Sequence, residues 1–104
     1  MEKIDKIADV FKALSDPTRL RIVKLLAECG TGVCEGGQLC VNALAHRLGV
    51  TQSAVSQHLR ILKQAGLVQG SRQGNFIHYS LDRDGIREYR NGLTETLGSE
   101  FDLG

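Results

Sequence analysis

Three cysteines fall within a short stretch of the chain, Cys29, Cys34 and Cys40, in the array C-x4-C-x5-C. Thiolate sulfur is a soft ligand that selects soft ions. Three thiolates suit the pyramidal centre of arsenite or antimonite. The same thiols could instead form a disulfide or a polysulfide bridge in response to an oxidant or to reactive sulfur. The residue types leave both chemistries open.

The surroundings of Cys34 favour a loop. The run "GTGVCEGGQLCVN" holds four glycines, and glycine loses backbone entropy in helices and strands. We expect Cys29 at a helix end, Cys34 in a loop able to wrap an ion, and Cys40 at a helix start. Zinc or cadmium is a weaker expectation, because zinc needs a fourth ligand such as His46 and these spacings are looser than common zinc motifs. Alternatively, Cys29 and Cys40 pack in the core and Cys34 is incidental.

The whole chain indicates one small soluble protein. Its 104 residues are 41% hydrophobic and 24% charged, which suits a single compact domain. No apolar run approaches the roughly 20 residues that cross a bilayer, and the N-terminus does not resemble a signal peptide. We therefore expect a cytoplasmic protein, where thiols are kept reduced. An odd number of cysteines also argues against a secreted disulfide scaffold.

The charge distribution points to a nucleic-acid partner, although the net charge is only +1. Residues 36–81 contain no Asp or Glu, but they hold four Lys or Arg residues and all three histidines. All 12 acidic residues lie in the remainder of the chain. A phosphate-facing surface excludes carboxylates, so we favour a nucleic-acid face over a chance distribution.

Apolar spacing predicts helices at about residues 4–14, 16–29, 39–48, 52–65 and 84–97, with a two-stranded hairpin over 67–81. Asp16 or Ser15 can cap the second helix, and Pro17 fits its first position. Gly49 and Gly66 suit helix C-termini. The second helix carries apolar residues that we expect to form a broad buried face: Leu20, Ile22, Val23, Leu25 and Leu26.

The third and fourth helices, joined by a turn containing Gly49, form a helix-turn-helix pattern. The fourth helix points Val55, Leu59 and Leu62 inward. Its other faces carry small hydroxyl, amide and guanidinium groups of the kind that bind base edges in the major groove: Gln52, Ser53, Ser56, Gln57 and Arg60.

Two further candidates for DNA contact are less distinct. His58 borders the core side of the fourth helix, where it can contact DNA or bond a neighbouring backbone group. Arg72, at the tip of the hairpin, can approach a phosphate or a minor groove as a wing does, or it can serve solubility alone.

These motifs resemble the ArsR/SmtB family of metal-sensing winged-helix repressors. The similarity rests on "LSDPTRLRIVKLL", "LCVNALAHRLGVTQSAVSQHLRILKQAGLV" and "GNFIHYSL", and it spans roughly residues 5–97. The resemblance implies a mainly α winged helix-turn-helix fold with a two-stranded β-hairpin wing and terminal dimerisation helices. It also implies a homodimer that binds double-stranded operator DNA in a promoter until an inducer releases it.

Within this resemblance we expect a single domain over residues 1–104. Its helix-turn-helix lies at about 39–65, its wing at about 67–81, and its dimerisation helices at about 2–14 and 84–97. Residues buried between the subunits should include Ile7, Phe11, Leu93 and Leu97.

The chain departs from the family where arsenic-responsive members carry Leu-Cys-Val-Cys-Asp-Leu. Here the sequence is "LCVNAL", so Cys40 matches the first cysteine, Asn42 replaces the second and Ala43 replaces the Asp. No histidine follows His78, which removes the final-helix metal site of zinc-sensing relatives. We therefore expect Cys29, Cys34 and Cys40 together to bind the inducer, arsenite or antimonite, with a redox or reactive-sulfur signal as the alternative.

An enzyme is not expected, since the sequence shows no glycine-rich phosphate loop, nucleophile elbow or paired carboxylate motif. The remaining alternative is a protein-interaction module that uses the terminal helices.

Overall fold

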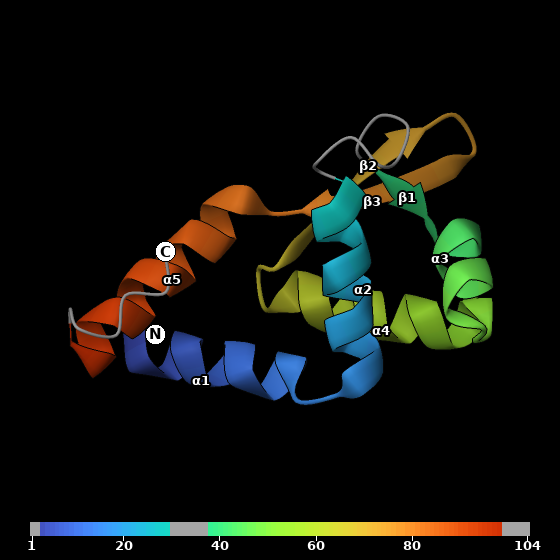
Figure 1. Ribbon diagram of the computed structural model, residues 1–104. Helices are drawn as coiled ribbons and strands as arrows, with labels where there is room; N and C mark the ends of the chain where they lie inside the picture. The colour runs from blue at the N-terminus through green and yellow to red at the C-terminus, as the bar shows by residue number, and fades with distance from the viewer. Residues whose placement is uncertain (1–2, 30–37, 99–104) are drawn as a thin grey trace.

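The computed structural model describes residues 3–29 and 38–98. These residues form the predicted order of helices and hairpin (Figure 1): α1 Lys3–Leu14, α2 Pro17–Glu28, β1 Leu39–Cys40, α3 Val41–Leu48, α4 Gln52–Gln64, β2 Val68–Gln73, β3 Phe76–Leu81 and α5 Arg83–Leu97. Within these ranges, no helix has both the length and the apolar character needed to cross a bilayer.

The sheet contains one more strand than the predicted hairpin. Its order is β1-β3-β2, all antiparallel, with Leu39 paired to Tyr79 and Cys40 to His78. The sequence predicts a helix from Leu39, but that helix begins only at Val41. The short strand β1 forms because the free edge of β3 carries backbone groups that need hydrogen-bond partners.

Helix α2 is central, since it packs against α1, α3, α4 and β3. Asp16 caps it and Pro17 takes the first helical position, as predicted. Ile22 and Leu26 are buried in the core, whereas Leu20 is 50% exposed. The expectation that Leu20 is buried is therefore wrong. At about 100° per residue, Leu20 lies roughly 200° around the helix from Ile22 and faces outward.

The core joins all the described helices except α5 to the sheet. Its buried members are Val10, Ala13, Ile22, Leu26, Cys29, Leu39, Leu44, Ala45, Val55, Leu59, Leu62, Leu67, Val68 and Leu81. Helix α5 contributes the partly buried Ile86 and Tyr89 at the edge of this cluster.

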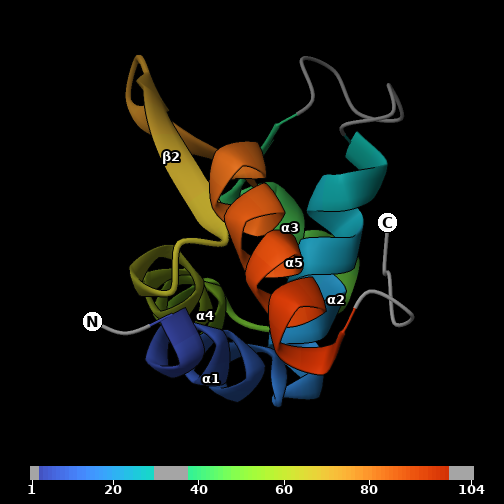
Figure 2. The same ribbon diagram turned by 90° about the vertical axis from the view of Figure 1, so that its left-hand side faces the viewer.

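Helices α1 and α5 lie side by side at one end of the molecule (Figures 1 and 2). A Cβ atom added at the buried Gly92 would lie 3.1 Å from the Ile7 side chain, so glycine permits the close approach of the two helices. The Lys3 ammonium group lies 2.6 Å from the Glu95 carboxylate on the exposed edge of the same contact.

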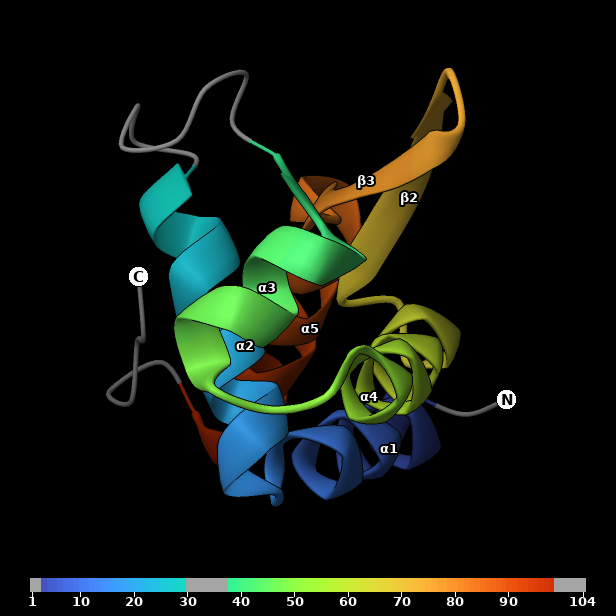
Figure 3. The same cartoon turned by 90° about the vertical axis from the view of Figure 1, so that its right-hand side faces the viewer.

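The β2–β3 hairpin turns at Gly74, whose φ of 63° is positive. Glycine populates that region without strain, and a type II′ hairpin turn requires it at the first central position. The hairpin and α4 lie along the same side of the molecule, whereas α2 lies on the other side (Figure 3).

The cap of α2 gives a test of this fold. Asp16 Oδ1 accepts hydrogen bonds from the N–H groups of Thr18 at 2.8 Å and Arg19 at 3.2 Å. Partial desolvation raises the pKa of Asp16, but these two hydrogen bonds and the charges of Arg19 and His58 outweigh it, and the net pKa is lowered.

We expect Asp16→Ala to lower the melting temperature at neutral pH. Because the folded-state pKa is lowered, the stabilisation by Asp16 is present above its unfolded-state pKa and is lost as the pH falls through the folded-state pKa. The difference between variant and wild type in thermal denaturation should therefore shrink in acid. Asp84→Ala is the control, since the Asp84 side chain is 94% exposed and forms an ion pair with Arg87 in the same helix. A difference that does not change with pH would contradict the role of the ionised cap.

Candidate nucleic-acid interface

One face of α4 is anchored in the core. The Thr51 hydroxyl caps the helix by accepting a hydrogen bond from the Ala54 N–H at 3.1 Å. Val55, Leu59 and Leu62 are at most 2% exposed, which confirms the predicted inward stripe. The candidate base-contacting side chains are all exposed on the remaining faces: Gln52, Ser53, Ser56, Gln57 and Arg60.

The start of α4 is tied to α3. The turn between them contains Gly49 with a φ of 68°, and its N–H donates to the Ala45 carbonyl at 2.9 Å. The Gln52 side-chain amide donates to Asn42 Oδ1 at 3.1 Å. Gln52 therefore braces the two helices, while its side-chain oxygen has no partner among the hydrogen bonds of the described residues.

His58 faces α2 rather than projecting with the exposed polar side chains. It is half-buried, and its Nδ1 lies 3.3 Å from Arg19 Nη1. Because guanidinium groups only donate, this contact is a hydrogen bond when His58 is neutral and its Nδ1 carries no proton. Arg19 Nε also donates to the Ala13 carbonyl at 2.6 Å. The local partner of His58 is thus a side chain, not the backbone group considered from the sequence.

Arg72 is exposed on β2. The neighbouring Gln73 amide donates to Gln38 Oε1 at 2.6 Å, which ties the hairpin tip to the chain just before β1. Phe76 and Ile77, opposite on β3, are 61% and 43% exposed. Sequence reasoning treated these two only as strand residues, although their position directly after the Gly74–Asn75 turn indicates the tip of a hairpin.

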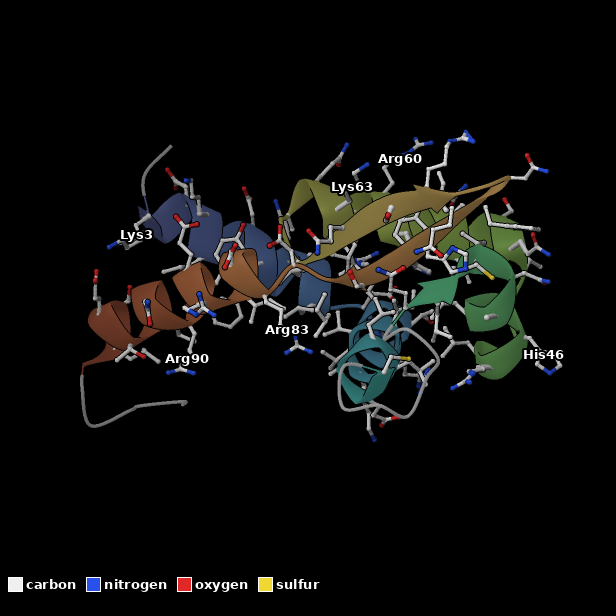
Figure 4. All side chains as sticks on the ribbon, turned by 90° about the horizontal axis from the view of Figure 1, so that it is seen from above. Lys3, His46, Arg60, Lys63, Arg83 and Arg90 are labelled. Carbon is white, nitrogen blue, oxygen red and sulfur yellow. The ribbon has the colours of Figure 1, made fainter. Side chains whose placement is uncertain are left out.

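One side of the molecule is built from α3, α4 and the hairpin. These elements carry basic side chains but no carboxylates, since residues 38–81 contain no Asp or Glu. In Figure 4, Arg60 and Lys63 project from the α4 edge of the molecule, whereas Arg90 lies on α5, away from that edge. Basic side chains on such a surface attract a polyanion, and the surface elements carry no carboxylates that would repel it.

The described residues contain two of the three candidate thiols. Cys29, at the C-cap of α2, is 1% exposed and disulfide-bonded. Cys40 is a half-buried free thiol at the N-cap of α3. Cys34 lies outside the described residues, and those residues contain no cluster of three His, Cys, Asp or Glu side chains able to hold a metal ion. The three-cysteine set therefore stays a prediction.

The structure adds a histidine that sequence reasoning did not include in the cysteine site. His78 stands opposite Cys40 in the β1–β3 pairing, and its Nδ1 is buried without a hydrogen-bond partner. Directly opposed residues of an antiparallel pair point to the same face of the sheet. His46, by contrast, is exposed on α3 at the edge of the molecule (Figure 4) and about 9 Å further along that helix than Cys40.

The four residues predicted at the dimer interface differ in how exposed they are in the single chain. Ile7 is 6% exposed and packs within the protomer near Gly92. Phe11 and Leu97 are 55% and 48% exposed, and Leu93 is half-buried. Phe11 and Leu93 line an apolar groove of about 200 Å³ between α1 and α5.

Comparison with known proteins gives close relatives. Residues 16–69 match the family described as "Bacterial regulatory protein, arsR family". An uncharacterized HTH-type transcriptional regulator of Methanocaldococcus jannaschii is 42% identical over 88 residues, covering 85% of this chain and 91% of that protein. The arsenical resistance operon repressor of Escherichia coli is 42% identical over 72 residues, covering 69% of this chain but only 56% of the repressor.

Solved structures of ArsR-type regulators have a fold similar to that of this chain. An ArsR-like transcriptional regulator from Rhodococcus sp. RHA1 matches with a TM-score of 0.74 and 30% identity over 95% of this chain and 85% of that one. The homodimeric winged helix-turn-helix DNA-binding domain of a possible ArsR-family regulator from Mycobacterium bovis matches with a TM-score of 0.69 and 32% identity over 93% of this chain and 82% of that one. The chain therefore belongs to the ArsR family of bacterial regulatory proteins, and it is a winged-helix DNA-binding transcriptional repressor rather than an enzyme.

Proposed function

We propose that two copies of this chain bind an operator as a homodimer and leave it when an inducer binds at the cysteines. The observation that carries the DNA part is the exposed Gln, Ser and Arg face of α4. Helix α4 lies on the same side of the molecule as the hairpin, and both belong to a carboxylate-free stretch of chain.

The polar face of α4 has the donors and acceptors that base edges require. Gln57 can bond adenine in a bidentate manner, Arg60 can bond guanine, and Ser56 is small enough for close approach. Ser53 and Gln52 lie at the N-terminal end, where a recognition helix enters the groove. Arg72 on the hairpin would contact the phosphate backbone. His58, held by Arg19, would support α4 from behind rather than contact a base.

A second copy of the chain would cover the apolar surface of α1 and α5. Phe11 and Leu97 are 55% and 48% exposed, and Phe11 lines the same apolar groove as Leu93. The Mycobacterium bovis domain, which has this fold, is homodimeric. A dimer places two recognition helices about one turn of DNA apart, as a two-fold symmetric operator needs.

The inducer is arsenite or antimonite bound by Cys29, Cys34 and Cys40. Trivalent arsenic hydroxide would exchange its three hydroxyl groups for three cysteine sulfurs, and each hydroxyl group would leave as water with the proton of one thiol, so the thiols must be reduced. The E. coli relative is by name a repressor of an arsenical resistance operon.

The path from these cysteines to α4 is short. Cys40 is the N-cap of α3, and α3 holds the start of α4 through the Asn42–Gln52 hydrogen bond. An ion that repositions Cys40 would therefore change the position of α4. It releases DNA only if it binds the DNA-free conformation more tightly, and DNA must then weaken ion binding to the same extent.

Redox or reactive-sulfur sensing is the second candidate, and the disulfide at Cys29 favours it. A sulfur in a disulfide is not a thiolate ligand, so oxidation and metalloid binding exclude each other at this residue.

DNA contact is tested on α4. We expect Gln57→Ala or Ser56→Ala to weaken operator binding by on the order of 1–3 kcal/mol, the value of a good base contact. Melting temperature and dimerisation should stay unchanged, because both side chains are exposed. Gln64→Ala is the matched control, since Gln64 lies on the same helix beside Asp9 and Lys12 of α1. Equal operator affinity in both α4 variants, measured by fluorescence anisotropy, would remove this helix face from base contact.

The dimer is tested on the apolar surface of α1 and α5. Phe11→Lys or Leu93→Lys should give monomers in sedimentation at micromolar concentration, and these monomers should bind the operator poorly because the two half-sites are no longer linked. Leu20→Lys is the control, because Leu20 is a similarly exposed apolar residue on α2. Wild-type protein that is monomeric and still operator-specific would contradict the proposed assembly.

The inducer is tested on the cysteines. In reduced protein, Cys34→Ser should keep operator affinity but abolish release by arsenite. Cys40→Ser should do the same with some loss of stability, because Cys40 is half-buried. Release of Cys34→Ser at the wild-type arsenite concentration would exclude Cys34 as a ligand. If an oxidant or a persulfide donor releases wild-type protein and arsenite does not, the redox candidate is correct.

A further inference from the structure

The C-terminal end of α4 is fixed by α5, the helix that joins the subunits in the proposed dimer. The Tyr89 hydroxyl on α5 donates a hydrogen bond to the carbonyl of Ala65, the C-cap residue of α4. The last carbonyls of a helix have no partner within the helix. Tyr89 therefore supplies a partner that α4 itself cannot provide.

Two glycines show how closely the backbones approach here. A Cβ atom at Gly85, in the first turn of α5, would lie 2.2 Å from the Gly66 carbonyl oxygen. A Cβ atom at Gly66 would lie 2.7 Å from the Tyr89 hydroxyl, and Gly66 has a φ of 79°. The Asp82 N–H, at the N-cap of α5, donates to the Leu67 carbonyl at 2.9 Å. The start of α5 and the end of α4 thus meet backbone to backbone.

The environment of Tyr89 keeps its hydroxyl a donor. Burial raises the pKa of Tyr89, and the nearby carboxylates of Glu88, Asp82 and Asp9 raise it further, so the hydroxyl holds its proton at physiological pH. The same side chain lines the apolar groove with Phe11 and Leu93. One residue therefore contacts both the surface proposed for dimerisation and the end of the recognition helix.

We propose that Tyr89 is a positioning residue that fixes the direction of α4 relative to α5 and thereby sets the half-site spacing that the dimer accepts. This inference rests on the proposed dimeric repressor. In such a dimer the separation of the two recognition helices is a geometric property of the protein, and the operator must match it. A hydrogen bond at the end of α4 limits rotation of that helix about its buried stripe.

The experiment measures the affinity of the wild-type dimer and of Tyr89→Phe for the operator and for operators with one base pair inserted or deleted between the half-sites. Tyr89→Phe keeps the ring and removes only the hydroxyl. We expect its preference for the native spacing over the altered spacings to fall by roughly two- to tenfold, the range of one neutral hydrogen bond. Dimerisation in sedimentation and binding to an isolated half-site should not change.

Tyr79→Phe is the matched control, because no hydrogen bond of the Tyr79 hydroxyl is found within residues 3–29 and 38–98, and it should keep the wild-type preference. If Tyr89→Phe does not fold, Tyr89→Met is the second variant, because it also lacks the hydroxyl but keeps an apolar side chain. An unchanged spacing preference in a folded, dimeric variant would overturn the inference, as would a wild-type dimer that binds all spacings equally. Wild-type protein that does not bind the operator would instead refute the proposed function.

Discussion

The burial of three apolar side chains on α4 is the constraint on which the rest of the structure depends. Val55, Leu59 and Leu62 fill the space between α2, α3 and the sheet, and each contributes about 1.5–3 kcal/mol by leaving water. Their spacing places all three on one side of the helix, so only one orientation of α4 about its own axis buries them together. The rotation that buries them also determines that Ser56, Gln57 and Arg60 face outward.

Much of this architecture could be predicted from the sequence, because it depends on local rules. The caps at Asp16 and Thr51 and the left-handed glycines at positions 49 and 66 follow from side-chain and backbone chemistry within one helix turn. The inward stripe of α4 follows from helical periodicity alone.

Features that depend on pairing between distant segments could not be predicted in this way. Strand β1 exists because β3 has a free edge, and two residues of apolar sequence carry no strand signal of their own. The same pairing brings His78 opposite Cys40, residues 38 positions apart in the chain. Leu20 was expected in the core because a run rich in Leu, Ile and Val does not itself distinguish the faces of α2. Cys34, the residue that most suggests a sensor, lies outside the described residues.

Polar contacts then restrain the start, the middle and the end of α4, and each contact links α4 to a different part of the molecule. Gln52 connects its start to α3 and so to Cys40, the Arg19–His58 contact connects its middle to α2, and Tyr89 connects its end to α5. A change at the cysteines and a change at the subunit interface would therefore reach the same helix from opposite ends.

Magnitudes indicate which of these interactions an inducer can alter. Coupling between an effector and a second ligand is typically 1–3 kcal/mol. A single hydrogen bond contributes about 0.5–1.5 kcal/mol net, whereas removing the three buried side chains of α4 from the core would cost several times more. A coupling free energy of this size is enough to break or shift the hydrogen bond between Gln52 and Asn42 and so to reorient α4. It is not enough to remove α4 from the core. In the repressor that we propose, release from DNA would accordingly be a small change in the direction of α4 within an intact core. The dimer would convert such a change into a mismatch with both half-sites at once.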